Sequence, residues 1–135
     1  MNRPLAALIA FTFLLLSCKN DKKSIPTTDT DVATTFIRDI LDNKISDAEQ
    51  YILKDTINMQ YFESFRQAYL KKDKAELEKF KSADILINEI SNVSDTVSIV
   101  NYSNSYKKES KNVLKLVRVN GKWLIDFKYT FSGNM

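Results

Sequence analysis

The only cysteine of the chain, Cys18, is the side chain whose position most clearly indicates a chemical reaction. It follows an uncharged apolar stretch, LAALIAFTFLLL at residues 5–16, and Arg3 supplies a positive charge before that stretch. A positive end, an apolar run and a small residue at the cleavage point are the three parts of an export signal. The run is shorter than the ~20 apolar residues that a membrane-spanning helix needs. We therefore expect residues 1–17 to be a removable signal peptide.

The residues that end at this cysteine, Leu15-Leu16-Ser17-Cys18, resemble the bacterial lipobox. The resemblance implies diacylglyceryl transfer to the Cys18 sulfur, cleavage between Ser17 and Cys18, and acylation of the new amino terminus. A thiolate is a strong enough nucleophile to form the thioether. Three acyl chains would make dissociation from a membrane negligible, since each buried CH₂ contributes about 0.8 kcal/mol. The alternative is an ordinary signal peptide followed by an incidental cysteine.

The lipobox resemblance implies a protein of the bacterial cell envelope whose partner is the lipid bilayer, reached through acylated Cys18. We expect the outer membrane rather than the inner membrane. Residues 18–30, CKNDKKSIPTTDT, are polar and cannot bury enough apolar surface to order themselves, so they are expected to be a flexible tether. Asp21 stands alone among lysines, which leaves the periplasmic and the surface face of the membrane both open.

Several reaction types are excluded by residues that the chain lacks. It contains no histidine, so mechanisms that need a histidine base or a histidine-bound zinc are excluded. Gly121 and Gly133 are its only glycines, so it has no glycine-rich phosphate loop. Acylation would consume the only thiol, which excludes a disulfide. We expect no metal site and no cofactor beyond the covalent lipid.

The charge balance predicts no nucleic-acid partner. Removing 17 of 135 residues leaves 118, enough for one domain with a tether, and we place that domain at residues 31–135. The signal takes Arg3 from 20 basic side chains and none of the 17 acidic ones, so the mature charge is +2. The two signs also intermix, as in KKDKAE at residues 71–76, so no surface of one sign can be expected to neutralise phosphates.

Helical patterns come first in the domain. Apolar residues recur at helical spacing over residues 32–41, with Asp29, Thr30 or Asp31 as the cap. Ser46 and Glu49 form a capping-box pattern for a short second helix. Further helices are predicted after two more caps, the first with an aromatic stripe and the second ending near residue 80; these caps are Asp55-Thr56 and Asp73 with Glu76.

Strand patterns follow the helices, over residues 85–92, 96–106, 111–120 and 122–131. Asn120-Gly121 predicts a type I′ hairpin turn between the last two strands, because both central residues of that turn need positive φ. In the last strand, Trp123, Ile125, Phe127, Tyr129 and Phe131 alternate with other residues, which indicates one core face and one solvent face.

Helices followed by an antiparallel meander predict an α+β fold, with N-terminal helices packed on a curved, cone-like sheet of four strands. Such a sheet could enclose an apolar pocket. Its candidate lining residues are Phe36, Tyr61, Phe65, Glu89, Trp123, Phe127 and Tyr129. The alternative is that the aromatic stripe is ordinary core.

Two segments, VATTFIRDILDNKISDAEQYI at residues 32–52 and VLKLVRVNGKWLIDF at residues 113–127, resemble the nuclear-transport-factor-2-like (cystatin-like) superfamily. Within it, the chain is similar to small bacterial lipoprotein domains of unknown function. The most distinctive piece is Asn120-Gly121-Lys122-Trp123. The superfamily includes isomerases, dehydratases and cyclases as well as binding and assembly modules, so the fold alone does not assign a function.

Two strand carboxylates are the candidates for acid–base chemistry. Enzymes of this superfamily that resemble ketosteroid isomerase use pocket carboxylates with tyrosine or acid donors. Asp126 has the opposite parity to Trp123 and Ile125, so we expect it to face water. Glu89 shares parity with Ile85 and Ile87, so the pattern allows it to point inward, and the alternative is a strand-end residue near solvent. We assign no residue as catalytic.

Three functional hypotheses follow. We favour a non-catalytic envelope lipoprotein whose domain binds a small apolar ligand or a protein partner. The second hypothesis is a cofactor-free isomerase-like enzyme that uses Glu89. The third is a structural or inhibitory subunit of an envelope complex. Apolar residues on both faces of the second predicted strand, Val97 and Ile99 on one and Val100 and Tyr102 on the other, would also suit a homodimer that pairs sheet to sheet.

Overall fold

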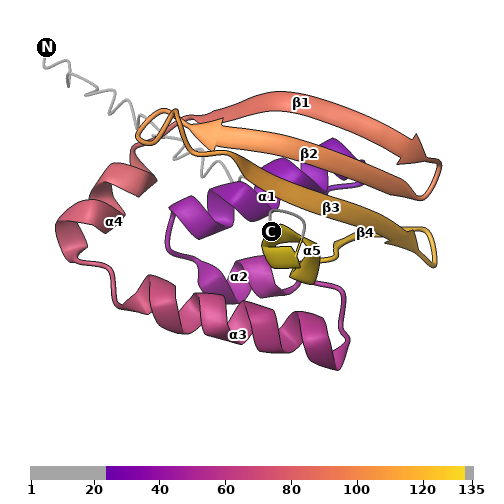
Figure 1. Cartoon of the computed structure of the whole chain (residues 1–135), viewed down its shortest axis with the longest axis horizontal. Coiled ribbons are helices and arrows are strands. Elements are labelled where there is room, and N and C mark those ends of the chain that lie inside the picture. Colours follow the sequence, from indigo (N-terminus) through magenta and orange to yellow (C-terminus); the bar gives the residue numbers. More distant parts are fainter. Residues whose placement is uncertain (1–23, 133–135) are drawn as a thin grey trace, which may run out of the picture.

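The computed structural model describes residues 24–132. The predicted signal peptide, Cys18 and the first part of the tether lie outside the described residues. Within them the chain forms an α+β domain of five helices and a four-stranded sheet, which confirms the expected fold class (Figure 1). The first four helices precede the strands in the sequence, and a short fifth helix follows them.

The sheet is an open antiparallel meander with the order β1-β2-β3-β4, so β1 and β4 are its edges and no cone is closed. The elements have these bounds: α1 Asp29–Leu41, α2 Ile45–Glu49, α3 Thr56–Leu70, α4 Lys74–Lys81, β1 Ile85–Ser94, β2 Val97–Asn104, β3 Asn112–Val119, β4 Lys122–Ile125 and α5 Lys128–Ser132. Helix α1 contacts all four strands and so covers the inner face of the sheet.

Helix starts are set by side-chain caps, though not always by the predicted ones. Thr28 caps α1 in a reciprocal capping box with Asp31, so the helix begins two residues before the expected domain boundary. The expected capping box at Ser46 is wrong, because α2 already begins at Ile45 and its N-cap, Lys44, makes no side-chain hydrogen bond. The caps predicted at Asp55 and Asp73 are confirmed for α3 and α4.

The hairpin turn between β3 and β4 is confirmed. Asn120 has φ of 50° and Gly121 has φ of 77°, as a type I′ turn requires. The strand after it is much shorter than predicted, because β4 ends at Ile125. From there the Asp126 N–H donates to the Lys115 carbonyl (2.9 Å), and the Thr130 hydroxyl donates to the Val113 carbonyl (3.0 Å).

Helix α5 therefore lies along the part of the β3 edge that β4 does not reach. The expected strand over residues 126–131 is wrong for a physical reason. Phe127 and Phe131 are four residues apart, so a helical turn brings their rings to one side, with centroids 5.3 Å apart. The alternating pattern of the sequence did not distinguish this turn from a strand.

Aromatic rings fill the interior between α1, α3 and α5. The Phe127 ring has its centroid 6.1 Å from that of Phe36, 5.2 Å from that of Phe62 and 5.6 Å from that of Phe65. Phe36, Phe62 and Phe127 are each at most 2% exposed. The aromatic stripe of α3 thus supplies packed core on the side that α1 and α5 cover.

We predict that Phe127→Ala lowers the free energy of unfolding by about 3–5 kcal/mol, because it removes the ring that Phe36, Phe62 and Phe65 contact in the core. Chemical denaturation followed by circular dichroism measures this loss. The matched control is Phe131→Ala, since Phe131 is 40% exposed and should cost much less. Equal losses in the two variants would show that Phe127 does not hold the core together.

Candidate functional site

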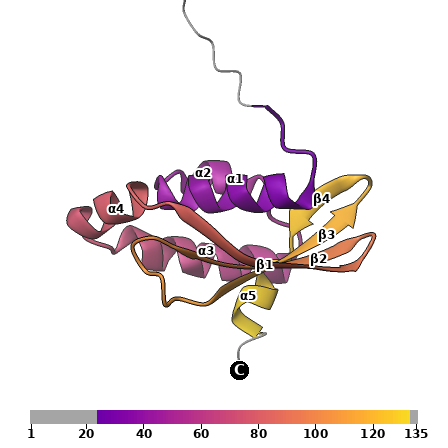
Figure 2. The same ribbon diagram turned by 90° about the horizontal axis from the view of Figure 1, so that it is seen from above.

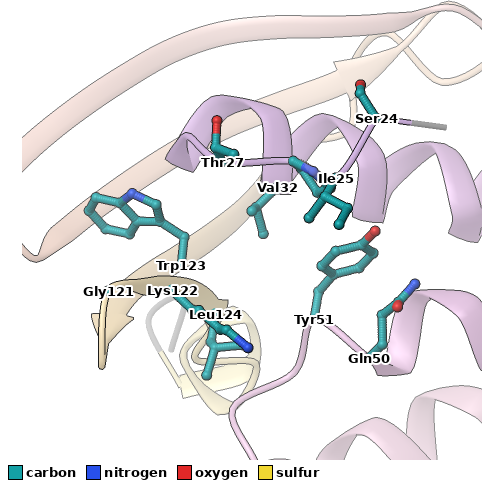
Figure 3. A pocket seen from close by; sticks show the side chains of 11 residues that line it. Ser24, Ile25, Thr27, Val32, Gln50, Tyr51, Gly121, Lys122, Trp123 and Leu124 are labelled. Atoms are coloured by element: carbon teal, nitrogen blue, oxygen red, sulfur yellow. The ribbon is translucent and has the colours of Figure 1, made fainter. Parts of the chain in front are cut away.

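A groove lies where the N-terminal segment meets the β3–β4 hairpin (Figure 3). Its cavity volume is about 510 Å³. Its walls come from three parts of the chain that are far apart in sequence. The lining residues are Ser24, Ile25, Pro26, Thr27, Val32, Gln50, Tyr51, Gly121, Lys122, Trp123 and Leu124.

Backbone pairing fixes two of these walls relative to each other. The Ile125 N–H donates to the Tyr51 carbonyl (2.8 Å), and the Leu53 N–H donates to the Ile125 carbonyl (2.9 Å). These bonds make a short parallel bridge between Ile52 and Ile125, both fully buried. The segment after α2 is thus held against β4 by backbone bonds, and Tyr51 and Trp123 line the same groove.

The third wall is the segment before α1. Because Thr28 caps the helix, residues 24–27 leave it in a defined direction, close to β4 (Figure 2). In Figure 3 the Ile25 side chain points toward the Tyr51 ring, and Trp123 lies at the other side of the groove, beside Thr27. Ile25 is 86% exposed, so a large apolar side chain stands in solvent at the rim.

Cationic side chains border the tryptophan. Trp123 pairs with Arg118 across the hairpin, and the Arg118 guanidinium lies 5.9 Å from the centroid of the Trp123 ring system. Lys122 is exposed next to it. The nearest carboxylates at the start of α1 are used locally, since Asp29 accepts from the Thr30 N–H and Asp31 accepts from the Thr28 N–H. The groove therefore combines apolar walls with a basic hairpin side, while Asp29 and Asp31 keep their negative charge at the start of α1.

The structure distributes the seven predicted pocket residues over several places. Trp123 lines the groove. Phe36, Phe65 and Phe127 belong to the packed core or lie against it. Tyr61 stacks on Phe131 of α5, with ring centroids 5.6 Å apart. Tyr129 belongs to α5, and its ring centroid lies 5.5 Å from the Lys115 ammonium. Glu89 is exposed on the outer face of the sheet.

Glu89 is turned outward by a β-bulge. Ile87 pairs with Tyr102 but Glu89 pairs with Asn101, so one extra residue sits in β1 between them. The alternation that begins at Ile85 and Ile87 is thereby shifted by one residue. The Glu89 carboxylate accepts a hydrogen bond from the Asn101 amide (3.2 Å) and is exposed. The inward placement that parity allowed is wrong, and the solvent alternative holds.

A buried polar cluster surrounds Asp126, which we expected to face water. Asp126 is only 7% exposed, because the chain leaves the strand at Ile125 and the parity rule no longer applies. The amide of fully buried Asn58 donates to Asp126 (3.2 Å) and to Asp55 (2.6 Å) and accepts from the Lys128 N–H (2.8 Å). The sequence analysis missed Asn58, whose only signal was its position three residues after the cap Asp55.

The electrostatics of this cluster keep Asp126 ionised. Burial alone raises the pKa of its carboxyl group, but hydrogen bonds from Lys128 and Asn58 and the charges of Lys128 and Lys115 outweigh that effect and lower the pKa below its usual range. The hydrogen bond that Lys128 donates to Asp126 in turn raises the pKa of Lys128. The Lys128 ammonium lies 2.8 Å from one Asp126 oxygen, and the Lys115 ammonium lies 3.4 Å from the other. A carboxylate held in this way is a structural anion rather than a free base.

Residues 24–132 contain neither a metal-binding cluster nor a membrane-spanning helix. Their His, Cys, Asp and Glu side chains do not gather in groups of three or more suited to a metal ion. No helix in this part of the chain has the length and apolar character needed to cross a membrane. In comparisons with known proteins, no family model, curated protein or solved structure matches the chain.

We predict that Asp126→Asn lowers the free energy of unfolding at pH 7 and makes that free energy depend less on pH in the acid range. The folded-state pKa lies below the unfolded value of about 3.9, so the contribution of Asp126 is present above that pH and is lost as the pH falls through the folded pKa. Unfolding by urea, measured from pH 7 to about pH 2.5, reports both effects. The control is Asp95→Asn in the exposed β1–β2 turn. If Asp126→Asn kept the wild-type dependence of stability on pH, Asp126 would not be an ionised carboxylate that stabilises the fold.

Proposed function

We propose that this protein is a membrane-anchored bacterial envelope lipoprotein and that its domain is a non-catalytic binding module. The observation that carries the proposal is the groove of about 510 Å³ with Trp123 and Tyr51 in its walls. Aromatic side chains that are neither fully buried nor fully exposed suit the binding of a partly apolar molecule. The ligand is a small apolar compound or an apolar part of a partner protein.

The lipid anchor is supported by the Leu-Leu-Ser-Cys sequence that ends at Cys18. The position of the groove agrees with it, since residues 24–27 of the tether line the groove and so bring the anchor and the binding surface together. The kinship to nuclear-transport-factor-2-like lipoprotein domains is part of the proposal and is supported by the order of helices before an antiparallel meander.

The enzymatic alternative lacks its expected base. An isomerase-like site would need a carboxylate aimed into an apolar pocket, whereas Glu89 lies on the outer face of the sheet. Asp126 is paired with two lysines and lies outside the groove lining.

The hypothesis of a structural or inhibitory subunit, or of a homodimer, has one supporting observation. Val97 pairs with Val117 next to Ile99 on the outer face, and all three are partly exposed.

We predict that Cys18→Ser abolishes incorporation of labelled palmitate and moves the protein from the membrane fraction to the soluble fraction or leaves it uncleaved. The matched control is Cys18→Ser combined with Ser24→Cys, which restores one thiol six residues later but not the lipobox. It should also remain unlabelled, because the modification depends on the sequence before the cysteine. Labelling of either variant would contradict the proposed anchor.

We predict that the lipidated protein, released from detergent micelles for native mass spectrometry, retains a small added mass that Tyr51→Ala and Trp123→Ala diminish. These substitutions remove the two large aromatic walls of the groove. Tyr61→Ala is the control, because Tyr61 stacks on Phe131 of α5, on the side opposite to the N-terminal segment (Figure 2). Equal retention in all variants would exclude the groove as the site.

Turnover of any substrate that Glu89→Gln abolishes at unchanged melting temperature would contradict a non-catalytic role.

A further inference from the structure

We infer that the groove and its rim form a membrane-docking surface, and that their partner is the anionic interface of the bilayer that carries the Cys18 lipid. The inference rests on the proposed lipid anchor and gives the groove a partner beyond the small ligand or protein of the proposed function. It follows from three properties of the described residues: where the tether joins the domain, which apolar side chains surround that point, and how charge is arranged around them.

The first property is the short distance to the anchor. Residues 24–27 line the groove, and Thr28, which follows them, caps α1. Only residues 19–23 separate them from Cys18. Six residue steps span at most ~22 Å when fully extended. An acylated Cys18 would therefore keep Ser24, and the groove beside it, close to the head-group layer.

The second property is the set of apolar and amphipathic side chains at this point. Ile25 is 86% exposed, so its side chain is available to enter an apolar environment, and burying it there would be favourable. Tyr51 lies next to Ile25 in the groove lining and Trp123 lies at the opposite side of the groove, and neither aromatic side chain is fully buried (Figure 3). Tryptophan and tyrosine prefer the boundary between head groups and acyl chains, because each has an apolar ring with a polar group.

The third property is the charge around these side chains. Lys122 and Arg118 border Trp123, and their long stems allow their charged groups to reach phosphates while the ring enters the interface. Residues 19–23 add three lysines and one aspartate. Glu49, next to the groove residue Gln50, is paired with Arg66 and Lys54. Arg118 and Lys122 therefore make the hairpin side of the groove positive, which suits the anionic head groups of a bilayer, whereas Asp29 and Asp31 at the start of α1 are negative.

The chain offers a direct reporter, since Trp123 is its only tryptophan. The mature, lipidated protein is reconstituted into vesicles of phosphatidylethanolamine and phosphatidylglycerol that contain phospholipids brominated at defined acyl positions. We expect a blue shift of the Trp123 emission on reconstitution. Quenching should be strongest for shallow bromines, because an interfacial ring lies about 5–10 Å into the head-group and acyl boundary. Vesicles of phosphatidylcholine alone should give weaker quenching.

Two matched pairs of variants test the surface. Ile25→Asp should reduce quenching, whereas Leu70→Asp should not, because Leu70 is equally apolar and 59% exposed but lies at the α4 end of α3, away from β4 (Figure 1). Moving the reporter by Trp123→Phe with Leu70→Trp should abolish quenching. Circular dichroism of each variant confirms that the domain is folded.

The outcomes separate the two proposals. Flotation of the protein with the vesicles tests the lipid anchor, and failure to float would overturn the anchor and the docking surface together. A protein that floats while Trp123 remains unquenched and open to aqueous acrylamide would overturn the docking surface alone. The docking surface would also be overturned if quenching were equal at Trp123 and at a tryptophan placed at residue 70. Shielding of Trp123 in cells by a crosslinked protein would overturn it as well.

Discussion

The buried amide of Asn58 is the interaction on which the arrangement of this domain depends. It joins the cap of α3, the end of β4 and the start of α5, because it bonds Asp55, Asp126 and the Lys128 N–H at once. A buried polar group without partners is costly, so these three groups have a strong preference for this one arrangement. Burial of the charged Asp126 is tolerated only because Lys128 and Lys115 accompany it.

The groove depends on this cluster through a short piece of backbone. Ile125 is the last residue of β4, next to Asp126, and its backbone pairs with Tyr51 and Leu53. Fixing the end of β4 therefore also fixes the segment that carries Tyr51. The hairpin turn at Asn120-Gly121 sets the other end of the strand and the position of Trp123. A polar cluster that contributes no atom to the groove thus determines how two of its walls face each other.

The sequence predicted those features that depend on local chemistry. The α+β class, the meander, the Asn-Gly turn and the caps at Asp55 and Asp73 all follow from periodicity or from one residue's conformational preference. It failed where a contact distant in sequence decides the outcome. The Asn58 amide bonds Asp126, 68 residues further along the chain and just past the end of β4, and no local pattern shows this contact or the bulge that turns Glu89 outward. The groove joins three separate segments and had no single sequence signal beyond Trp123.

The boundary between tether and domain changes how the anchor must be understood. A free segment over residues 18–30 would hold a domain at a variable distance and let it rotate with no preferred face. In the structure Thr28 caps α1 and residues 24–27 form one wall of the groove, so only residues 19–23 lie between this wall and Cys18 in the sequence. A shorter connection raises the effective concentration of the attached face at the bilayer. Lipidation at Cys18 would then orient the domain as well as retain it, because the chain enters the fold through the same face that carries Trp123, Lys122 and the exposed Ile25.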